Sequence, residues 1–211
     1  MIARRARLCA ALATWTLVVA VPVLNALPVA AKIKAAFDAI NATRKGAINV
    51  DEWDVASFAL FRAADKNNDN FIDRDELKAS TMALDTFLRA DVDRDGRLSV
   101  AEFTELRRAI FETADIDRND FVTLVEFELM IVMEQVGWQD RNQNGRIELS
   151  ELGASLAKAF DELDADHDGT LSPAEAAFMR PAAFSRYDTN RDGTLTREEY
   201  VSGYRTEMMS G

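Results

Sequence analysis

The chain lacks most of the residues on which catalysis or covalent cross-linking depends. Its 211 residues include one cysteine, Cys9, and one histidine, His167. A single cysteine excludes an internal disulfide and any zinc site made of several thiolates. A Gly-rich phosphate loop, a nucleophile elbow and a zinc-ligand spacing are also absent from the sequence. We therefore do not expect an enzyme.

Acidic residues are missing from the first 31 positions, where a basic start, MIARRAR, precedes an apolar run from Leu8 to Leu24. The small residues of the segment PVAA follow, so this region has the three parts of a secretory signal peptide cleaved after about Ala31. An uncleaved membrane anchor is the alternative, although two prolines and Asn25 interrupt the end of the apolar run. We expect residues 1–31 to be a signal peptide (or N-terminal membrane anchor) and the protein to be exported, either periplasmic or secreted. Cleavage would remove Cys9 and leave no thiol.

Basic residues are scarce in the remainder of the chain. Residues 32–211 contain all 36 acidic residues but only 22 of the 25 basic ones, which gives them a net charge of −14. This charge disfavours nucleic acid as a partner, because phosphate binding needs clustered Lys and Arg, and it suits metal cations. Hydrophobic residues make up 48% of the chain, which is enough for a packed core.

What residues 32–211 do contain is a repeated twelve-residue segment, such as DADHDGTLSPAE from Asp164 to Glu175. Oxygen-bearing side chains stand at positions 1, 3 and 5, a residue that tolerates a left-handed backbone at 6, an aliphatic residue at 8 and Glu at 12. The seven copies begin 24 to 26 residues apart, and we number them loops 1 to 7: 41–52, 65–76, 91–102, 115–126, 140–151, 164–175 and 188–199. Solvated acidic turns have no reason to keep such regular spacing, so the copies are interpreted as one repeated structural unit.

The repeated segment resembles the calcium-binding loop of EF hands, and the resemblance extends over nearly all of residues 32–211. Calcium takes about six to eight oxygen ligands, which such a loop supplies from side chains, from the carbonyl at position 7 and from both oxygens of Glu at position 12. The resemblance implies an all-α fold: a tandem array of short-spaced EF-hand (helix–loop–helix) repeats, with small β-bridges between paired loops. It also implies Ca2+ as the cofactor. Secreted bacterial multi-EF-hand proteins of the calsymin type are similar in this respect.

Carried over position by position, the resemblance implies metal ligands at positions 1, 3, 5, 7 and 12 of loops 2 to 7. These residues are Asp65, Asn67, Asp69, Phe71, Glu76, Asp91, Asp93, Asp95, Arg97, Glu102, Asp115, Asp117, Asn119, Phe121, Glu126, Asp140, Asn142, Asn144, Arg146, Glu151, Asp164, Asp166, Asp168, Thr170, Glu175, Asp188, Asn190, Asp192, Thr194 and Glu199. His167 stands at position 4, which in such loops is a solvent-facing non-ligand.

The seven loops differ in charge, and their predicted affinities differ with it. Loops 3 and 6 combine four acidic side chains with a glycine at position 6 and are predicted to bind most tightly. Loops 2 and 4 carry Asn70 and Asp120 at position 6, so they are predicted to be filled but weaker. Loop 1 is degenerate, since Asn41, Thr43 and Lys45 replace acidic ligands and the ammonium group repels a divalent ion. We interpret loop 1 as a structural partner that binds no ion.

The residues around the loops predict how they are connected. A phenylalanine stands four residues before six of the loops, and Val136 before loop 5. About a dozen residues separate successive loops, so one helix of about 15 residues is expected to leave one loop and lead into the next. The segment 100–115 illustrates this with Phe103, Leu106, Ile110 and Phe111 on one helical face. Pro181 is expected to kink or split the last connecting helix.

Two loop positions predict further contacts. The aliphatic residue at position 8 is expected to point into the core and to join two loops through a short β-bridge. Four loops also have Ser or Thr at position 9 followed by Glu at position 12, a capping box that predicts the start of a helix. These capping residues are Ser99, Thr123, Ser172 and Thr196.

Calcium binding in an exported protein, as a buffer or a sensor, is the function that the sequence predicts. The alternative is a calcium-rigidified interaction module that docks on a partner protein at the cell envelope. Its motivation is the apolar segment 126–138, which contains Met130, Met133 and Trp138. A helix that is apolar on every side is more often buried, and we favour that interpretation. Membrane contact is expected only if the leader is retained.

Overall fold

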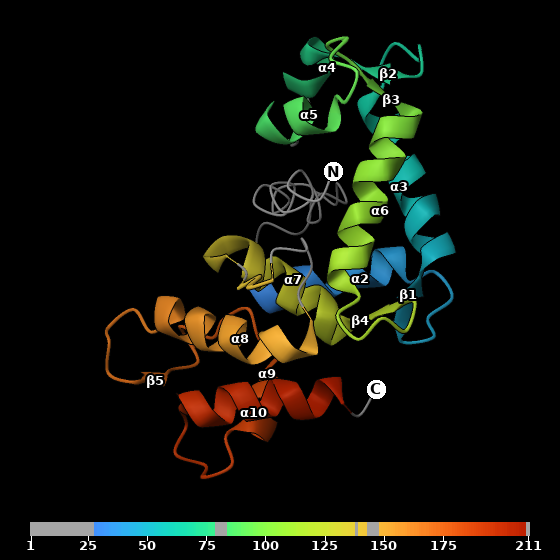
Figure 1. Ribbon diagram of the computed structural model, residues 1–211. Helices are drawn as coiled ribbons and strands as arrows, with labels where there is room; N and C mark the ends of the chain where they lie inside the picture. The colour runs from blue at the N-terminus through green and yellow to red at the C-terminus, as the bar shows by residue number, and fades with distance from the viewer. Residues whose placement is uncertain (1–27, 79–83, 138, 143–147, 210–211) are drawn as a thin grey trace.

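The computed structural model describes residues 28–78, 84–137, 139–142 and 148–209 (Figure 1). The leader and Trp138 therefore lie outside the described residues, as do Asn144, Arg146 and Ile147 of loop 5. The helices are α2 (Val29–Ile40), α3 (Val50–Ala64), α4 (Arg74–Lys78), α5 (Leu84–Ala90), α6 (Val100–Ala114), α7 (Leu124–Val136), α8 (Leu149–Leu163), α9 (Pro181–Tyr187) and α10 (Arg197–Met208). The strands are β1 (Ala47–Asn49), β2 (Phe71–Ile72), β3 (Leu98–Ser99), β4 (Phe121–Thr123), β5 (Thr170–Leu171) and β6 (Leu195–Thr196). The all-α class with small β-bridges is confirmed.

The strands join the loops in three antiparallel pairs, and the first pair skips along the sequence. β1 pairs with β4, β2 with β3, and β5 with β6. Loop 1 is thus joined to loop 4, loop 2 to loop 3, and loop 6 to loop 7. The position-8 residues face each other in every bridge, as Ile48↔Val122, Ile72↔Leu98 and Leu171↔Leu195, and all six side chains are fully buried. The predicted role of position 8 is confirmed for these six loops.

Helices α3 and α6 form the long antiparallel pair of the molecule, with one loop pair at each end (Figure 1). α3 leaves loop 1 and leads into loop 2, whereas α6 leaves loop 3 and leads into loop 4. Each has 15 residues, as does α8 between loops 5 and 6, so the prediction of shared helices is confirmed there. The Phe61 and Phe103 rings pack edge-on at 5.5 Å between α3 and α6, and those of Trp53 and Phe111 at 5.7 Å.

The ends of the helices follow from the loop sequence itself. Where a phenylalanine stands four residues before a loop, its carbonyl accepts the N–H of the first loop residue, as Phe61 does from Asp65 at 2.9 Å. The same phenylalanine side chain is buried before loops 1, 2, 3, 4 and 6, while Phe184 before loop 7 is half-buried. Helix starts follow the capping boxes: Ser99, Thr123 and Thr196 each accept the N–H of the Glu at position 12. The periodic phenylalanines therefore fix both the core and the point where each loop begins.

The segment after loop 6 departs from the prediction in one respect. The capping box forms, with the Ser172 N–H donating to Glu175 at 2.9 Å, but residues 173–179 make turns in place of an α-helix. Pro181 then occupies the first turn of α9, after which the chain leads into loop 7. The expected split at Pro181 is thus confirmed, because Pro181 keeps Arg180 extended (φ −62°, ψ 133°) and ends any helix there. The helix expected directly after Ser172 is wrong, since residues 173–179 form turns.

The apolar segment after loop 4 is core. Met130 and Met133 of α7 are 1% and 0% exposed, and Phe127 of the same helix packs edge-on against Phe37 of α2 at 5.8 Å. The interpretation of this helix as buried is confirmed for Met130, Met133 and Phe127, which the core encloses. Within the described residues, none of the helices combines the length and the apolar character that crossing a bilayer requires.

A close helix contact in the C-terminal part gives a first prediction. A Cβ at Gly203 of α10 would lie 2.3 Å from Cγ of Tyr187, so Gly203→Ala is expected to lower the free energy of unfolding by about 1–3 kcal/mol through overpacking. Urea unfolding in calcium measures the change. Gly153→Ala in α8 is the matched control, because no atom lies within 4 Å of its Cβ and Ala favours a helix by about 0.5–1 kcal/mol. Equal stability of Gly203→Ala and wild type would contradict this packing.

Candidate metal centres

The backbone of each described loop turns sharply at two positions. Position 6 is left-handed at its glycines, such as Gly96 with φ +85°, and also at Asn70 and Asp120, which both have φ +66°. The expectation that Asn and Asp tolerate this conformation is confirmed. Position 4 is left-handed as well, which the sequence did not predict, at Arg44, Asn68, Arg94, Arg118, His167 and Arg191. His167 is exposed there, as expected for a non-ligand.

The double turn directs the carboxylates of a loop toward its centre, as loop 6 shows. Asp164 accepts the N–H groups of Asp168 and Gly169, both at 3.1 Å. Asp168 accepts the N–H of Thr170 at 2.8 Å and also its hydroxyl. Glu175 at position 12 accepts the N–H of Ala165 at 2.9 Å and so folds back over the start of the loop. These hydrogen bonds hold the loop in a ring.

Three loops bring three carboxylates together so closely that they repel one another. Each set has one oxygen per residue within 4.8 Å of the others: Asp91, Asp93 and Glu102 in loop 3, Asp115, Asp117 and Glu126 in loop 4, and Asp164, Asp166 and Asp168 in loop 6. In each set the residue at position 1 is buried. Like charges at this separation are costly unless a cation lies between them. An all-oxygen donor set of this kind fits calcium.

Loops 2 and 7 present a mixed donor set. Asn67 and Asn190 at position 3 offer an amide oxygen that accepts the N–H at position 5, at 2.8 and 2.9 Å. The loops retain the ring of hydrogen bonds, since Glu76 accepts the N–H of Lys66 at 2.8 Å and Glu199 that of Thr189 at 3.0 Å. They therefore hold the same geometry with an amide in place of the carboxylate at position 3.

Loop 5 is described only in part. Glu151 accepts the N–H groups of Arg141 and Asn142 at 2.9 and 3.2 Å, as the last residue of the other loops does. Asn144 and Arg146, two of its predicted ligands, lie outside the described residues. The two ends of loop 5 thus meet as predicted.

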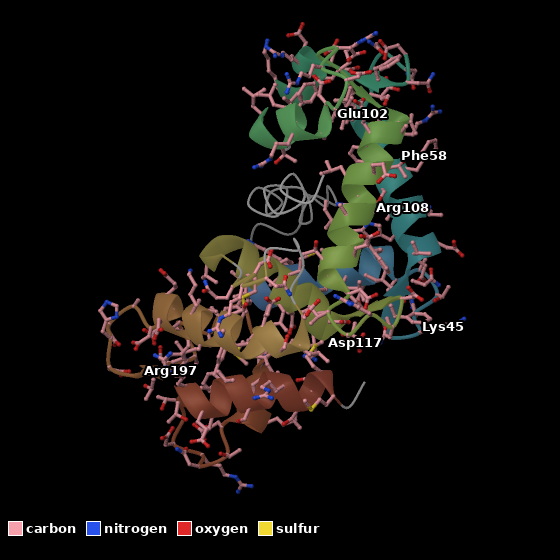
Figure 2. The ribbon with its side chains drawn as sticks, viewed as in Figure 1. Lys45, Phe58, Glu102, Arg108, Asp117 and Arg197 are labelled. Atoms are coloured by element: carbon pink, nitrogen blue, oxygen red, sulfur yellow. The ribbon has the colours of Figure 1, made fainter. Side chains whose placement is uncertain are left out.

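Loop 1 keeps the same ring without acidic partners. Glu52 accepts the N–H of Thr43 at 2.7 Å and that of Asn49 at 3.1 Å. Burial opposes ionisation of Glu52, but these hydrogen bonds and the charge of Lys45 outweigh it and lower its pKa. Figure 2 shows Lys45 and Asp117 of loop 4 at the same end of the α3–α6 pair, as the pairing of loops 1 and 4 requires. Loop 1 thus keeps the loop geometry and is bridged to loop 4.

The glutamates at position 12 are not electrostatically equivalent. Glu126 of loop 4 is fully buried, and burial raises its pKa despite the hydrogen bonds from Thr123. Glu199 of loop 7 also loses solvation, but hydrogen bonds from Thr196, Thr189 and Asn190 outweigh this loss and lower its pKa to about 2. Loop 7 therefore holds its carboxylate ionised, whereas loop 4 holds a desolvated carboxylate that gains more from a cation.

Side-chain contacts join neighbouring loops and join α7 to the N-cap of α9, and no sequence pattern predicts them. Arg118 of loop 4 forms an ion pair with Glu148 of loop 5 at 2.8 Å. Arg97 of loop 3 lies over the Phe71 ring of loop 2, with 4.1 Å from its guanidinium carbon to the ring centroid. Glu128 of α7 is fully buried and contacts Arg180; burial raises the pKa of this carboxyl to about 7, although Arg180 opposes the shift. Because these partners are 26 to 52 residues apart, no local pattern marks them.

The low pKa of Glu199 predicts a pH-dependent stability. Its native pKa of about 2 lies below the ordinary value of 4.5, so the ionised group contributes stability above about pH 4.5 that is lost as the pH falls toward 2. In chelator, Glu199→Gln is expected to lower the free energy of unfolding at pH 7, and its difference from wild type is expected to shrink between pH 4.5 and 2. Urea unfolding across this range measures it. Glu198→Gln, at an exposed neighbour, is the control; a difference independent of pH would contradict the prediction.

Comparison with known proteins agrees with this geometry. Four segments, residues 59–81, 84–106, 156–175 and 181–202, match the family model described as EF hand, and they contain loops 2, 3, 6 and 7. Curated proteins yield no match. Among solved structures the chain is similar to Mg2+-loaded apo-berovin, a light-sensitive ctenophore photoprotein in which all three Ca2+-binding loops bind magnesium, at 18% identity and a TM-score of 0.28 over 84% of this chain and 87% of that one. The four matched segments and the acidic clusters together indicate EF-hand repeats with Ca2+ as their ion.

Proposed function

We propose that the protein is an exported, non-enzymatic calcium buffer in which loops 2 to 7 each bind one ion. The observation that carries this proposal is the convergence of three carboxylates to within 4.8 Å in loops 3, 4 and 6. The ligands would be the residues at positions 1, 3, 5, 7 and 12 that the sequence predicts, with loop 1 as an ion-free partner of loop 4. Six bound ions would bring the net charge of residues 32–211 from −14 to about −2.

Calcium binding is expected to stabilise the fold strongly. Without the ion, each acidic loop retains mutual repulsion among its carboxylates, which the backbone hydrogen bonds only partly offset. A ligand that binds the folded chain in preference to the unfolded chain adds its binding free energy to stability. The melting temperature is therefore tied to the free calcium concentration.

The burial of α7 supports a buffer over a sensor. A sensor changes shape on binding and uncovers apolar surface, as EF-hand sensor proteins do. Here Met130 and Met133 are already enclosed by the core while the loops hold their ring geometry. Docking on a partner through α7 would require calcium to uncover these side chains.

Export is the second half of the proposal and rests on the leader sequence. Cleavage after about Ala31 would remove the first three residues of α2, among them the buried Ala30. The remaining nine residues of α2 retain Ile33, Phe37 and Ile40, which are its large core side chains. The shortened helix therefore keeps its contacts with α7. The mass of the N-terminal peptide of the exported protein tests the position of the cut.

Calorimetric titration tests the calcium sites. Wild-type protein is expected to bind about six Ca2+ ions and to prefer Ca2+ to Mg2+, because Mg2+ demands a stricter geometry and gives up its water reluctantly. Glu102→Gln removes the position-12 ligand of loop 3 and is expected to lower the stoichiometry by one. Glu105→Gln, at an exposed residue of the same helix, is the matched control and should leave it unchanged. A stoichiometry of one or two would contradict the assignment of loops 2 to 7.

A dye that fluoresces on apolar surface distinguishes a buffer from a sensor. Because α7 is buried, the dye signal is expected to stay flat or to fall when calcium is added to the chelator-treated protein. Measurement at constant ionic strength separates this effect from screening of charge. A calcium-dependent rise would favour the sensor and interaction-module hypothesis.

A further inference from the structure

The helix that leaves loop 4 carries two buried glutamates that face in different directions. Glu126 and Glu128 of α7 are both fully buried. Two residues along an α-helix correspond to a rotation of about 200°, so the two side chains lie on nearly opposite faces. Glu126 closes loop 4 by accepting the N–H of Ile116 at 3.0 Å and that of Thr123 at 2.9 Å. Glu128 points away from loop 4.

The partner of Glu128 belongs to the C-terminal part of the chain. Nε of Arg180 lies 2.7 Å from Oε1 of Glu128. The same guanidinium group forms a second ion pair with Glu207 of α10 at 2.9 Å. One arginine therefore joins α7 to α10, and we name the three residues Glu128, Arg180 and Glu207 the buried relay.

The buried relay ends on both helices that flank loop 7. Arg180 is the N-cap of α9, whose last residue, Tyr187, directly precedes Asp188 of loop 7. α10 begins directly after β6 of loop 7, and its Glu207 also accepts the hydroxyl of Tyr187. Loop 7 in turn is bridged to loop 6 through β5 and β6. A shift of Arg180 would therefore move α9 and α10, which flank loop 7, and through the β-bridge it would also move loop 6.

The full burial of Glu128 makes its end of the relay stiff, while the Arg180 and Glu207 side chains are 24% and 16% exposed. A charge that loses its partner inside a protein has no water to replace it, so the two sides of a buried ion pair tend to move together. An ion in loop 4 would be ligated by the Glu126 carboxylate, which stands in the first turn of α7. Glu128 lies half a turn further along that helix, so a rotation of α7 changes the distance to Arg180 unless α9 and α10 follow.

We propose that the buried relay couples ion binding at loop 4 to ion binding at loops 6 and 7. The inference rests on the calcium binding proposed above and adds a regulatory connection between its sites. Coupling of this kind is reciprocal, and typical values correspond to about 5- to 150-fold changes in affinity. Filling loop 4 raises the calcium affinity of the C-terminal pair, and filling that pair raises the affinity of loop 4.

Glycine amides allow each site to be followed separately in the full-length chain. The chain has nine glycines, and Gly169 and Gly193 occupy position 6 of loops 6 and 7. Their N–H groups donate to Asp164 at 3.1 Å and to Asp188 at 3.0 Å, so their NMR signals respond to an ion in the loop. Loop 4 has Asp120 at that position and therefore gives no position-6 glycine signal. In a calcium titration of 15N-glycine-labelled protein, the Gly169 and Gly193 signals therefore report on the C-terminal pair, while other position-6 glycines, such as Gly96, report on their own loops.

The decisive experiment removes the position-12 ligand of loop 4, once in the wild type and once in variants that lack the relay. Glu126→Gln is expected to raise the calcium concentration for half-saturation at Gly169 and Gly193 about tenfold. In a background of Arg180→Met, the added Glu126→Gln is expected to change it less than about twofold. Glu128→Gln, which keeps the shape of the side chain, provides a second background with the same expectation. Circular dichroism confirms that each background is folded.

Arg186→Met is the matched control. Arg186 contacts the same Glu207 at 2.7 Å but is mostly exposed and forms no part of the relay, so the tenfold effect should persist in this background. A tenfold effect that also persists with Arg180→Met and with Glu128→Gln would overturn the relay, as would a Glu126→Gln effect absent from the wild-type background. If neither glycine signal responded to calcium in the wild type, calcium binding by loops 6 and 7 would itself be wrong, which is a separate result.

Discussion

The pairing of loops through their position-8 residues is the constraint on which the rest of the structure depends. A β-bridge holds two loops side by side, and the buried aliphatic pair beneath it fixes their register. Because α3 and α6 each carry a loop at both ends, the pairing of loop 2 with loop 3 sets the two helices antiparallel and brings loop 1 against loop 4. The pairing of loops far apart in the sequence is thus a consequence of helices that serve two loops.

The pairs differ in what they offer a cation. Loops 2 and 3, and likewise loops 6 and 7, join two sites with acidic ligands, whereas loop 4 is joined to a loop in which Lys45 stands at position 5. Loop 4 is therefore paired with a loop that lacks acidic residues at positions 1, 3 and 5. Loop 4 lies where the N-terminal and C-terminal parts of the chain meet. Its Arg118 forms an ion pair with Glu148 of loop 5, and the helix that carries its buried Glu126 contacts Arg180 through Glu128. Figure 2 shows Glu102 and Asp117 at opposite ends of α6, which separates this junction from the loop 2 and 3 pair.

The sequence predicted those parts of the fold that repeat. Seven copies in register identified the loops, the phenylalanine four residues before a loop marked the core, and the short spacing required shared helices, as α3, α6 and α8 show. It left open which loops pair, because every loop has an equivalent residue at position 8. The left-handed backbone at position 4 was not predicted, because arginine, which stands there in several loops, is not a residue that typically marks a turn. Glu128 and Arg180 were also missed, since single charged residues 52 positions apart carry no periodic signal.

The length of the shared helices weakens the electrostatic repulsion between the charges at their two ends. Fifteen residues of α-helix span about 22 Å, so the charges gathered at the two ends of α3 and α6 are more than two screening lengths apart in physiological salt, where that length is about 8 Å. Cations collected at one end therefore do little to repel those arriving at the other. Because helices keep the sites apart, a small protein can hold many divalent ions without the mutual repulsion that a compact cluster of ions would cause.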